Sequence, residues 1–404
     1  MKENNLSTLD RRSFLKTAGL LVGAFSTSKL DVFGSSTSVL QENCLFKCNP
    51  IVLSASPDII DIMCITTKPT YCWLHYGAET NNLNMKTREV RDGMAHIGTV
   101  HHFKLKNLDA GKQYQYVIEA VEVQGMERKD SRFGQKESSN SYTVNTFSKN
   151  DPQLYFLVYN DMHETPESFG LLRNLAPSKQ PDFYVLNGDM VSSMRSEDHF
   201  VNNVLVPMAE VSGSSVPIVY SRGNHETWSN HARQITDYLL DQEHPFYYGF
   251  RKGPAYILVL DSGESRKDSD PVNWGLTEFD EYRKEQGEWL KREVEKPEFK
   301  EAKHKIVITH IPAFYSKNPV HAADHYFSLW GDTLNKSGIS LMICGHTHTP
   351  GIHPAQPGKI EFPVVIGGGP KQNKRTLISV IADENKLQLK LIHETGKLLG
   401  ELTV

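Results

Sequence analysis

Side chains that bind metal ions recur at five places in the second half of this sequence. They are Asp161-Met162-His163, Gly188-Asp189, Gly223-Asn224-His225-Glu226, Thr309-His310 and Gly345-His346-Thr347-His348. Imidazole nitrogens combined with carboxylate and amide oxygens, without thiolate, suit Zn, Mn or Fe, and the histidines argue against an all-oxygen Ca or Mg site. We therefore expect a metal site assembled from segments that lie far apart in the chain.

Taken singly, each motif has a structural alternative. Asp161 and His163 fit a surface turn, and a Gly-Asn-His segment is also common in turns. His310 fits a buried, hydrogen-bonded histidine, and Asp189 fits the cap of a following helix. The ordered series of five argues for one shared site more strongly than any single member does.

Continuous apolar runs precede these motifs and would position them. The runs are 154–159, 183–186, 216–220, 256–260, 306–309, 341–344 and 364–367. Runs of this kind are typical of strands buried on both faces, and amphipathic segments such as 201–208 and 286–295 lie between them. The pattern predicts an α/β fold with parallel strand neighbours, in which ligands bind at the carboxyl ends of the strands. The segment 377–392 predicts a closing hairpin.

Two further features concern the local geometry of the motifs. The two-residue spacing of Asp161 and His163 directs both side chains to the same side if the backbone is extended. Glycines at 188, 223 and 345 allow sharp backbone turns beside a crowded site.

The preceding part of the chain has a different pattern of apolar and polar residues. Short runs at 59–66, 70–76, 101–105 and 114–123 alternate apolar and polar residues, which predicts an antiparallel β-sandwich. The segment 108–114 resembles the turn and tyrosine corner of fibronectin type III domains. We interpret residues 44–148 as such a domain, with a structural or substrate-framing role, and residues 149–404 as the α/β domain. Pairing of Cys64 with Cys72, or of Cys44 with Cys48, stays open.

The amino-terminal segment resembles a twin-arginine export signal. Arg11 and Arg12 precede Ser13-Phe14-Leu15-Lys16 and an apolar stretch at 17–25, and the pattern departs from the usual one only at Asp10. That stretch is too short to span a bilayer. The resemblance implies that residues 1–43 are a signal peptide and linker with an undetermined cleavage point, read by the twin-arginine export machinery. The mature protein would then be periplasmic or extracellular, without a membrane span. The alternative is the start of an amphipathic helix.

Composition excludes several other classes. Lys and Arg number 44 against 48 Asp and Glu, so the formal charge of −4 offers no excess for binding long nucleic acid. Five cysteines are too few for a disulfide scaffold. Any chemistry on phosphate must therefore depend on local charge.

The motif series D-x-H, G-D, G-N-H-[DE], H and G-H-x-H resembles that of the calcineurin-like metallophosphoesterases, over residues 154–399. With a fibronectin-like domain in front, the layout is similar to that of purple acid phosphatases. The resemblance implies a four-layer α/β/β/α sandwich that holds two divalent or trivalent metal ions. By position, Asp161, His163 and His348 would hold one ion and Asn224, His310 and His346 the other, and Asp189 would bridge them.

The resemblance also implies a mechanism. A metal-bound hydroxide would attack the phosphorus in line with the ester oxygen, and His225 would act as general acid toward the leaving group. A purely structural role for His225 is the alternative. Arg222 and His231 are weak candidates for substrate binding, since a solvated loop position or an ion pair accounts for them equally well.

One position departs from both relevant patterns. Three residues after Asp189, purple acid phosphatases have an iron-binding tyrosine and protein Ser/Thr phosphatases have an aspartate that orients the catalytic histidine. This sequence has Ser192 there. We therefore expect no tyrosinate-to-iron absorption, and the acid role of His225 lacks its usual carboxylate support.

Together these features predict an exported, metal-dependent phosphoesterase that acts on small phosphomonoesters. Two alternatives remain: a phosphodiesterase, nuclease or nucleotidase on the same centre, and a non-catalytic exported binding module. Seven metal-binding residues argue against the last, because a single structural ion needs only four.

Overall fold

The computed structural model describes residues 44–78, 82–148, 150–240 and 242–404. These described residues belong to one compact unit. The expected signal peptide and linker, 1–43, lie outside the described residues. Among the described helices, none combines the length and the apolar character needed to cross a membrane.

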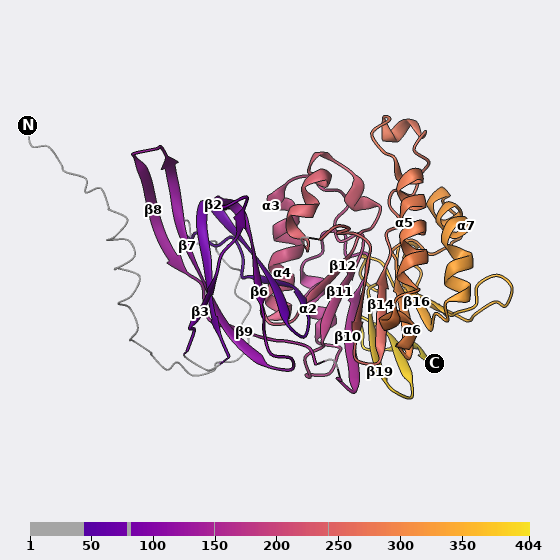
Figure 1. The fold of residues 1–404 in the computed structure, drawn as a ribbon. Coiled ribbons are helices and arrows are strands. Elements are labelled where there is room, and N and C mark those ends of the chain that lie inside the picture. The colour runs from indigo at the N-terminus through magenta and orange to yellow at the C-terminus, as the bar shows by residue number, and fades with distance from the viewer. Residues whose placement is uncertain (1–43, 79–81, 149, 241) are drawn as a thin grey trace, which may run out of the picture. The chain divides into compact units, whose positions relative to one another are not determined.

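The amino-terminal part of this unit is built from antiparallel strands (Figure 1). The two runs predicted at 59–66 and 70–76 belong to one long strand, β2 (Ile59–Gly77). Its first half pairs with β1 (Ile51–Ala55) and β6 (Gly98–Lys106), and its second half pairs with β3 (Met85–Thr87) and β7 (Gln113–Met126). The remaining strands are β4 (Val90–Arg91), β5 (Met94–Ala95), β8 (Ser131–Ser138) and β9 (Tyr142–Asn145).

A buried apolar core lies inside this β-rich region. Ile62, Leu74, Phe103 and Tyr116 belong to it and are fully buried. Alternate residues of β6 and β7 point inward, as the sequence pattern predicted. All five cysteines are free thiols in the structure.

Two six-stranded sheets form the carboxyl-terminal part. The first has the order β12-β11-β10-β19-β20-β21, and the second has the order β13-β14-β15-β16-β18-β17. The strands of the first are β10 (Gln153–Tyr159), β11 (Phe183–Asn187), β12 (Ile218–Ser221), β19 (Thr376–Asp383), β20 (Leu387–His393) and β21 (Leu398–Thr403). Those of the second are β13 (Tyr248–Lys252), β14 (Ala255–Val259), β15 (His304–Ile308), β16 (Leu341–Cys344), β17 (Gly351–His353) and β18 (Val364–Ile366).

The predicted strand pairing is confirmed. Strands β10, β11 and β12 run parallel, as do β14, β15, β16 and β18. The predicted hairpin is the antiparallel pair β19 and β20. Parallel neighbours require crossovers, and helices supply them except between β16 and β18, where the connection contains strand β17.

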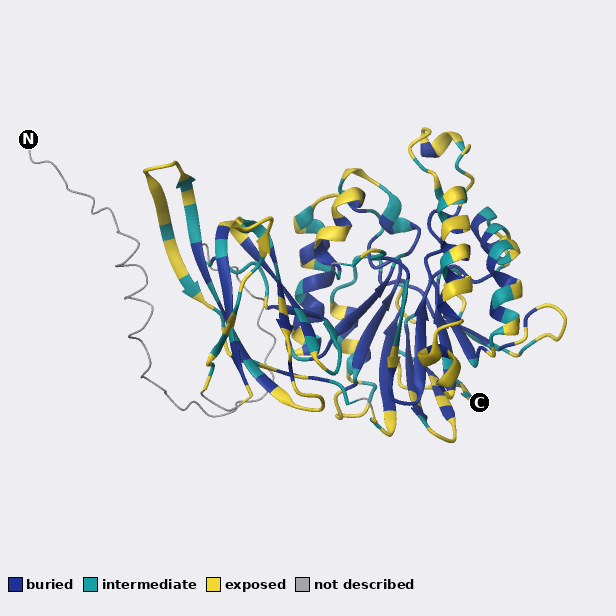
Figure 2. Ribbon diagram, viewed as in Figure 1, coloured by how far each residue is buried: buried dark blue, intermediate teal, exposed yellow. Residues whose placement is uncertain are grey.

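The two sheets face each other across one core, and helices cover their outer faces (Figures 1 and 2). In β10, Leu154, Phe156 and Val158 face the second sheet, while Tyr155 and Leu157 face the helices. The helices are α2 (Glu167–Arg173), α3 (Glu197–Phe200), α4 (Val206–Ser212), α5 (Phe279–Glu293), α6 (Pro297–Glu301) and α7 (His321–Lys336). This four-layer α/β/β/α arrangement is the predicted one.

The helix predicted at 201–208 has a more complex form. A π-helical turn, η1 (Val201–Leu205), joins α3 to α4, so one continuous helical segment runs from 197 to 212. The helix predicted at 286–295 begins earlier, at Phe279, and is α5. Three short 3-10 helices complete the described chain: η2 (His225–Thr227), η3 (Asn230–Tyr238) and η4 (Pro271–Asn273).

Candidate metal centre

The loops after five strands meet at one edge of the two sheets. They follow β10, β11 and β12 of the first sheet and β15 and β16 of the second. All seven predicted ligand residues, and His225, lie in these loops and contact one another: Asp161, His163, Asp189, Asn224, His225, His310, His346 and His348. Carboxyl ends of parallel strands are where α/β folds place ligands.

A first group of donor atoms consists of Asp161, His163 and His348. The Oδ1 atom of Asp161 lies 3.2 Å from Nε2 of His348. Both oxygens of Asp161 also accept a hydrogen bond from the backbone N–H of His346, at 3.0 Å. The carboxylate is fully buried, so these contacts fix its orientation.

A second group consists of Asp189, His310 and His346. The Nε2 atom of His310 lies 3.0 Å from Oδ2 of Asp189. Asn224 joins this group, because its Oδ1 atom lies 2.9 Å from Nδ1 of His346. The opposite nitrogen of His310, Nδ1, is within 2.9 Å of the carbonyl oxygen of Asn187, which leaves Nε2 directed at the site.

Asp189 faces both groups. Its Oδ2 atom lies 3.0 Å from Nε2 of His310 and 3.7 Å from Nε2 of His163. The His163 nitrogen is buried without a hydrogen-bond partner, and the His310 nitrogen is buried against the carboxylates of Asp189 and Asp161. Buried polar atoms without partners are costly, and cations placed between these nitrogens and the carboxylates would satisfy them. The residues present therefore fit metal ions held by nitrogen and oxygen donors.

The backbone of these loops is left-handed at several non-glycine residues. They are Asp161 (φ 50°), His163 (φ 42°), Glu164 (φ 64°), Asp189 (φ 53°), His346 (φ 67°) and His348 (φ 52°). Each such residue costs about 1–2 kcal/mol, and such strain clusters at functional sites. The expectation of extended backbone between Asp161 and His163 is therefore wrong. The two side chains meet because backbone hydrogen bonds from Asp161 to Gly188 and from His163 to Asp189 align the two loops.

Glycine gives the loops room at two positions. Gly188 has φ 75°, and a Cβ atom there would lie 2.4 Å from Nδ1 of His310. A Cβ atom on Gly345 would lie 2.4 Å from Oδ2 of Asp161. Any larger residue would collide with a proposed ligand.

Burial and mutual charge set the protonation of the metal-free centre. Burial lowers the pKa of His163, and it lowers that of His346 to about 4 with help from charge on His310. Burial alone would lower the pKa of His310. The negative charges of Asp189 and Asp161 have a larger effect and raise the pKa of His310 to about 10. Burial alone would raise the pKa of Asp189, yet His310 holds it well below its usual range. His163 and His346 thus keep lone pairs free for a cation.

His225 lies beside the centre and is oriented by backbone. Its Nδ1 atom is 2.9 Å from the carbonyl oxygen of Ser192, and its own N–H donates to Oδ1 of Asp189 at 3.0 Å. Nε2 lies 3.8 Å from Oδ2 of Asp189. The ring packs on Trp228, with the ring centroids 4.0 Å apart. A backbone carbonyl therefore orients the His225 ring, and no carboxylate contacts its Nδ1 atom in the described structure.

Glu226 is the site residue whose role the sequence does not reveal. Its buried carboxylate accepts hydrogen bonds from the backbone N–H groups of Gly223 (2.9 Å), Asp189 (2.9 Å) and Met190 (2.7 Å). It therefore ties the loop after β12 to the loop after β11. Its one sequence signal is its place as the last letter of the G-N-H-E motif. Glu264, also fully buried, similarly accepts a hydrogen bond from Trp228.

Arg222 and His231, the two candidates for substrate binding, both make contacts within the protein. Arg222 pairs with Asp261 at 2.5 Å, and its guanidinium stacks 3.8 Å from the ring centroid of Phe246. His231 lies 2.9 Å from the hydroxyl of Tyr238. These contacts indicate that Arg222 and His231 hold the loops in place.

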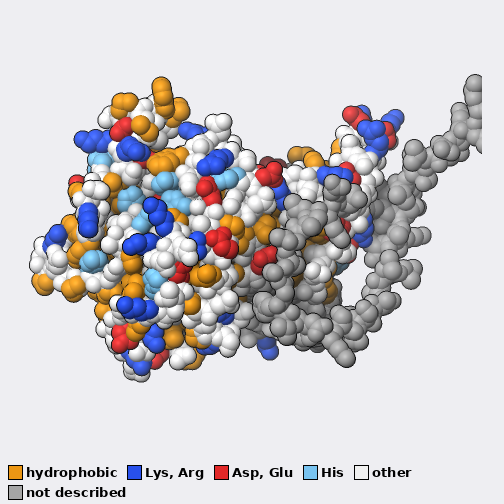
Figure 3. Space-filling view, turned by 180° about the vertical axis from the view of Figure 1, so that it is seen from behind, with side chains coloured by type: hydrophobic (Ala, Val, Ile, Leu, Met, Phe, Trp, Pro, Cys, Tyr) orange, Lys and Arg blue, Asp and Glu red, His pale blue; other side chains and the backbone are white. Residues whose placement is uncertain are grey.

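A cavity of about 230 Å³ adjoins the centre at His346. Its walls combine apolar side chains, among them Phe314 and Val320, with the charged side chains of Asp324 and Lys359. His225 and His348 keep 25% and 41% of their side-chain surface exposed. A group of histidine side chains reaches the surface on the face shown in Figure 3. Solutes can therefore approach the centre.

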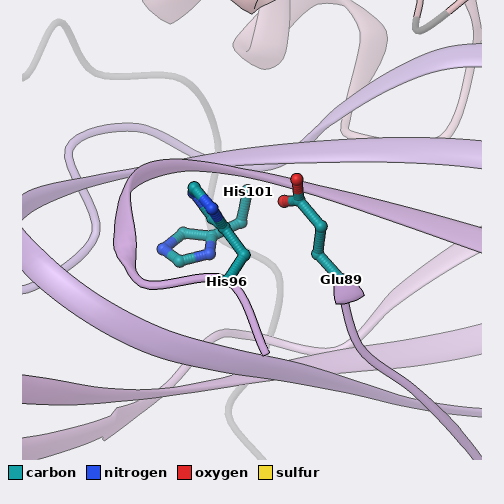
Figure 4. Close-up of side chains that lie close together, drawn as sticks. All are labelled: Glu89, His96 and His101. Atoms are coloured by element: carbon teal, nitrogen blue, oxygen red, sulfur yellow. The ribbon is translucent and has the colours of Figure 1, made fainter. Parts of the chain in front are cut away.

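A separate histidine cluster lies in the β-rich region, where Glu89, His96 and His101 come together (Figure 4). Its donor atoms are already used. Nε2 of His101 contacts Thr70 Oγ1 at 2.8 Å, and Nε2 of His96 contacts the carbonyl oxygen of Val100 at 3.0 Å. Local hydrogen bonding accounts for this cluster.

Residues 154–350 match the family model of the calcineurin-like phosphoesterases. Residues 154–350 therefore form a calcineurin-like phosphoesterase domain. The match ends before the last five strands, β17 to β21, and begins after the β-rich region. No part of the expected fibronectin-like domain falls within it.

Among curated proteins, the chain is similar to the serine/threonine-protein phosphatase CPPED1 of Rattus norvegicus, with 24% identity over 197 residues. The CPPED1 of Pongo abelii is 23% identical over 193 residues. Each match covers 46% of this chain and 58% of the relative, so the chain spans little more than half the length of the curated relatives.

Two solved structures share the fold. The purple acid phosphatase PPD1 from yellow lupin (Lupinus luteus) seeds matches with a TM-score of 0.65 and 14% identity, over 88% of this chain and 73% of that one. The structure of PhoD matches with a TM-score of 0.59 and 11% identity, over 88% of each chain. Each similarity covers 88% of this chain, so it includes residues of the β-rich region as well as the phosphoesterase domain.

Proposed function

We propose that this protein is an exported phosphomonoesterase that uses two metal ions. The observation that carries the proposal is the position of Asp189. One oxygen of this buried carboxylate lies 3.0 Å from His310 and 3.7 Å from His163, which belong to different donor groups. A carboxylate shared in this way is suited to bridging two cations.

Two ions of Fe, Mn or Zn fit the donor set. One ion would be held by Asp161, His163 and His348. The other ion would be held by Asn224, His310 and His346, and Asp189 would contact both ions. When bound, the ions would supply Lewis acidity toward the phosphoryl group and make water nucleophilic at neutral pH. The chain itself contributes fixed ligands, because buried hydrogen bonds orient both carboxylates before any cation arrives.

His225 is the proposed general acid. The Ser192 carbonyl engages Nδ1, so Nε2 is the nitrogen left to face a substrate. A proton held at Nε2 can pass to the leaving alkoxide as the P–O bond breaks. The cavity beside His346, which has both apolar and charged walls, would receive the organic group of the ester.

The names of the similar proteins favour monoester substrates. CPPED1 is called a serine/threonine-protein phosphatase and the lupin protein a purple acid phosphatase. Diester or nucleotide hydrolysis on the same centre is the competing outcome of the test below.

The test is reconstitution of the metal-free chain with Mn, Zn or Fe, followed by assays on p-nitrophenyl phosphate and bis(p-nitrophenyl) phosphate. We expect faster hydrolysis of the monoester and about two metal equivalents per chain at the centre. Asn224→Ala should lose one equivalent, whereas the matched control Asn203→Ala, on helix η1, should lose none. A chain that binds two equivalents and hydrolyses neither ester would overturn the enzymatic proposal.

Export through the twin-arginine machinery is the proposed route, supported by Arg11 and Arg12. A fusion of residues 1–43 to a folded fluorescent reporter should leave the cytoplasm, and the Arg11→Lys, Arg12→Lys double variant should not. Equal export of both fusions would argue against this route.

The proposal also keeps a fibronectin type III-like assignment for residues 44–148. It is supported by the hydroxyl of Tyr114, which accepts a hydrogen bond from the backbone N–H of Asp109 at 2.8 Å, the contact of a tyrosine corner. The region packs on the phosphoesterase domain, where the Tyr116 hydroxyl donates to the carbonyl oxygen of Ser214 at 2.7 Å. We assign it a structural role.

A further inference from the structure

A third group of metal-binding side chains lies on the helices that cover the second sheet. Asp280 is in the first turn of α5, and His321 and His325 are in the first two turns of α7. The two helices are neighbours on the outer face of that sheet (Figure 1). None of these three residues belongs to the centre described above.

The donor atoms converge on one carboxylate oxygen. Oδ1 of Asp280 lies 2.7 Å from Nε2 of His321 and 3.2 Å from Nδ1 of His325. His321 and His325 are four residues apart, so they lie on the same face of α7, and their rings stack with centroids 5.2 Å apart. All three donor atoms lie within 4.8 Å of one another.

One of these atoms is buried without a partner. Nδ1 of His325 makes no hydrogen bond although it is shielded from solvent. A nitrogen lone pair aimed at a carboxylate oxygen is unfavourable unless a proton or a cation lies between them. Burial lowers the pKa of His325, which favours the neutral ring that binds metals.

The surroundings hold the carboxylate in place. Arg283, one turn further along α5, donates from Nη1 to the same Oδ1 atom at 2.9 Å. The other guanidinium nitrogens of Arg283 donate to the backbone carbonyls of Ser262 and Glu264, so this side chain is fixed. Carboxylate ligands of metal ions are commonly hydrogen-bonded in this way.

We propose that Asp280, His321 and His325 bind a single divalent ion of the zinc class, at a site separate from the phosphoesterase centre. Two imidazoles and one carboxylate supply three of the four ligands of a tetrahedral zinc ion, and water completes the set. Ligands about 2.0–2.1 Å from zinc lie about 3.3 Å apart in a tetrahedral site, close to the 3.2 Å between His325 and Asp280. The 2.7 Å contact of His321 with the same oxygen is a hydrogen bond, so His321 must lose this bond and move slightly apart from Asp280 when the ion binds. Side-chain exposures of 20–36% leave an entry path.

The test compares metal stoichiometry in the full chain. Wild-type protein and the His321→Ala, His325→Ala double variant are stripped with a chelator, loaded with Zn²⁺, desalted and analysed for metal per chain. We expect the double variant to bind one equivalent less than wild type. Its hydrolysis of p-nitrophenyl phosphate should stay within about twofold, since the variant leaves the phosphoesterase centre untouched.

Two variants serve as controls. His244→Ala with His393→Ala removes two histidines from outside every cluster and should not change the stoichiometry. Asp280→Asn keeps an acceptor for Arg283 but removes the charge, so it should weaken Zn²⁺ binding at this site at least about tenfold. Equal stoichiometry in wild type and the His321/His325 variant would overturn the proposal.

A crystallographic measurement covers the case in which the double variant fails to fold. Crystals of wild-type protein grown with Zn²⁺ should give an anomalous peak at the zinc edge between α5 and α7. Absence of that peak, with zinc present at the phosphoesterase centre, would refute the site. The outcome does not depend on catalysis, so failure of the proposed function would leave this test intact.

Discussion

The imidazole of His225 is held by the backbone carbonyl of Ser192, with 2.9 Å between Nδ1 and the oxygen. A carbonyl oxygen accepts a hydrogen bond from the ring N–H, and this contact fixes the orientation of the ring. His225 therefore has an orienting partner although position 192 lacks an acidic side chain. This relationship shapes the first two predictions.

Removal of the His225 imidazole should slow turnover without loss of metal. We expect His225→Ala to lower kcat by about 10²–10⁴-fold, the usual contribution of a general acid. The loss should be larger for phenyl phosphate than for p-nitrophenyl phosphate, because a poor leaving group depends more on protonation. The measurement is kcat for both esters together with metal content. Equal losses on the two esters would contradict the acid role.

Replacement of the Ser192 side chain should have little effect. Ser192→Ala keeps the carbonyl that engages His225, and it removes the hydroxyl contacts with Glu164 at 3.1 Å and His163 at 3.5 Å. We expect kcat and metal content within about threefold of wild type, because such hydrogen bonds contribute about 1 kcal/mol or less. A loss as large as that of His225→Ala would show that the hydroxyl, rather than the backbone, positions the ring.

Loss of the Glu226 carboxylate should destabilise the fold at the centre. Three backbone N–H groups donate to it, so Glu226→Gln turns one acceptor into a donor and leaves a buried N–H unsatisfied. We expect a loss of about 2–4 kcal/mol in the free energy of unfolding, measured by urea denaturation of the metal-free protein. The exposed Glu285→Gln is the matched control and should change stability by less than about 0.5 kcal/mol.

Metal uptake should depend on pH. In the metal-free chain, Asp189 and Asp161 overcome burial and raise the pKa of His310 to about 10, so a cation at Nε2 must displace a proton. Affinity should rise between pH 6 and 8, by up to about tenfold per pH unit for each proton released. Competition with a chelator at several pH values measures this, and a flat profile would count against His310 as a ligand.

The same proton stabilises the metal-free fold. The pKa of His310 is higher in the folded chain than in the unfolded one, about 6.5. Its contribution is therefore complete below about pH 6.5 and disappears as the pH rises toward 10. Urea denaturation of the stripped protein across this range should show the decline, which bound metal should abolish.

The sheets could be predicted from the sequence because their strands are buried on both faces. The run at 154–159 contains no charged residue, and an uninterrupted apolar run of this length between polar segments is typical of a buried strand. Short, half-buried strands such as β17 (Gly351–His353) carry no comparable signal. Nor does the sequence predict that 59–66 and 70–76 form one strand, since the intervening Lys68-Pro69 suggests a break.

The membership of the centre could be predicted, but its geometry could not. The motif series identifies eight residues that the structure brings together, whereas the left-handed conformation of Asp161 and His163 depends on hydrogen bonds to another loop. Backbone acceptors such as the Ser192 carbonyl have no sequence signature. The contact of Asp280 with His321 joins residues 41 positions apart on different helices, so only packing reveals it.

The six left-handed non-glycine residues named in the loops of the metal centre also bear on how this protein could be engineered. Asparagine tolerates the left-handed region better than histidine, so a library selected for heat resistance without metal would enrich asparagine at sites such as His163 and His346. Such variants would have a higher melting temperature but would lack imidazole donor atoms for the metal ions. A selection that rewards turnover at each round would be needed to keep thermostable progeny active.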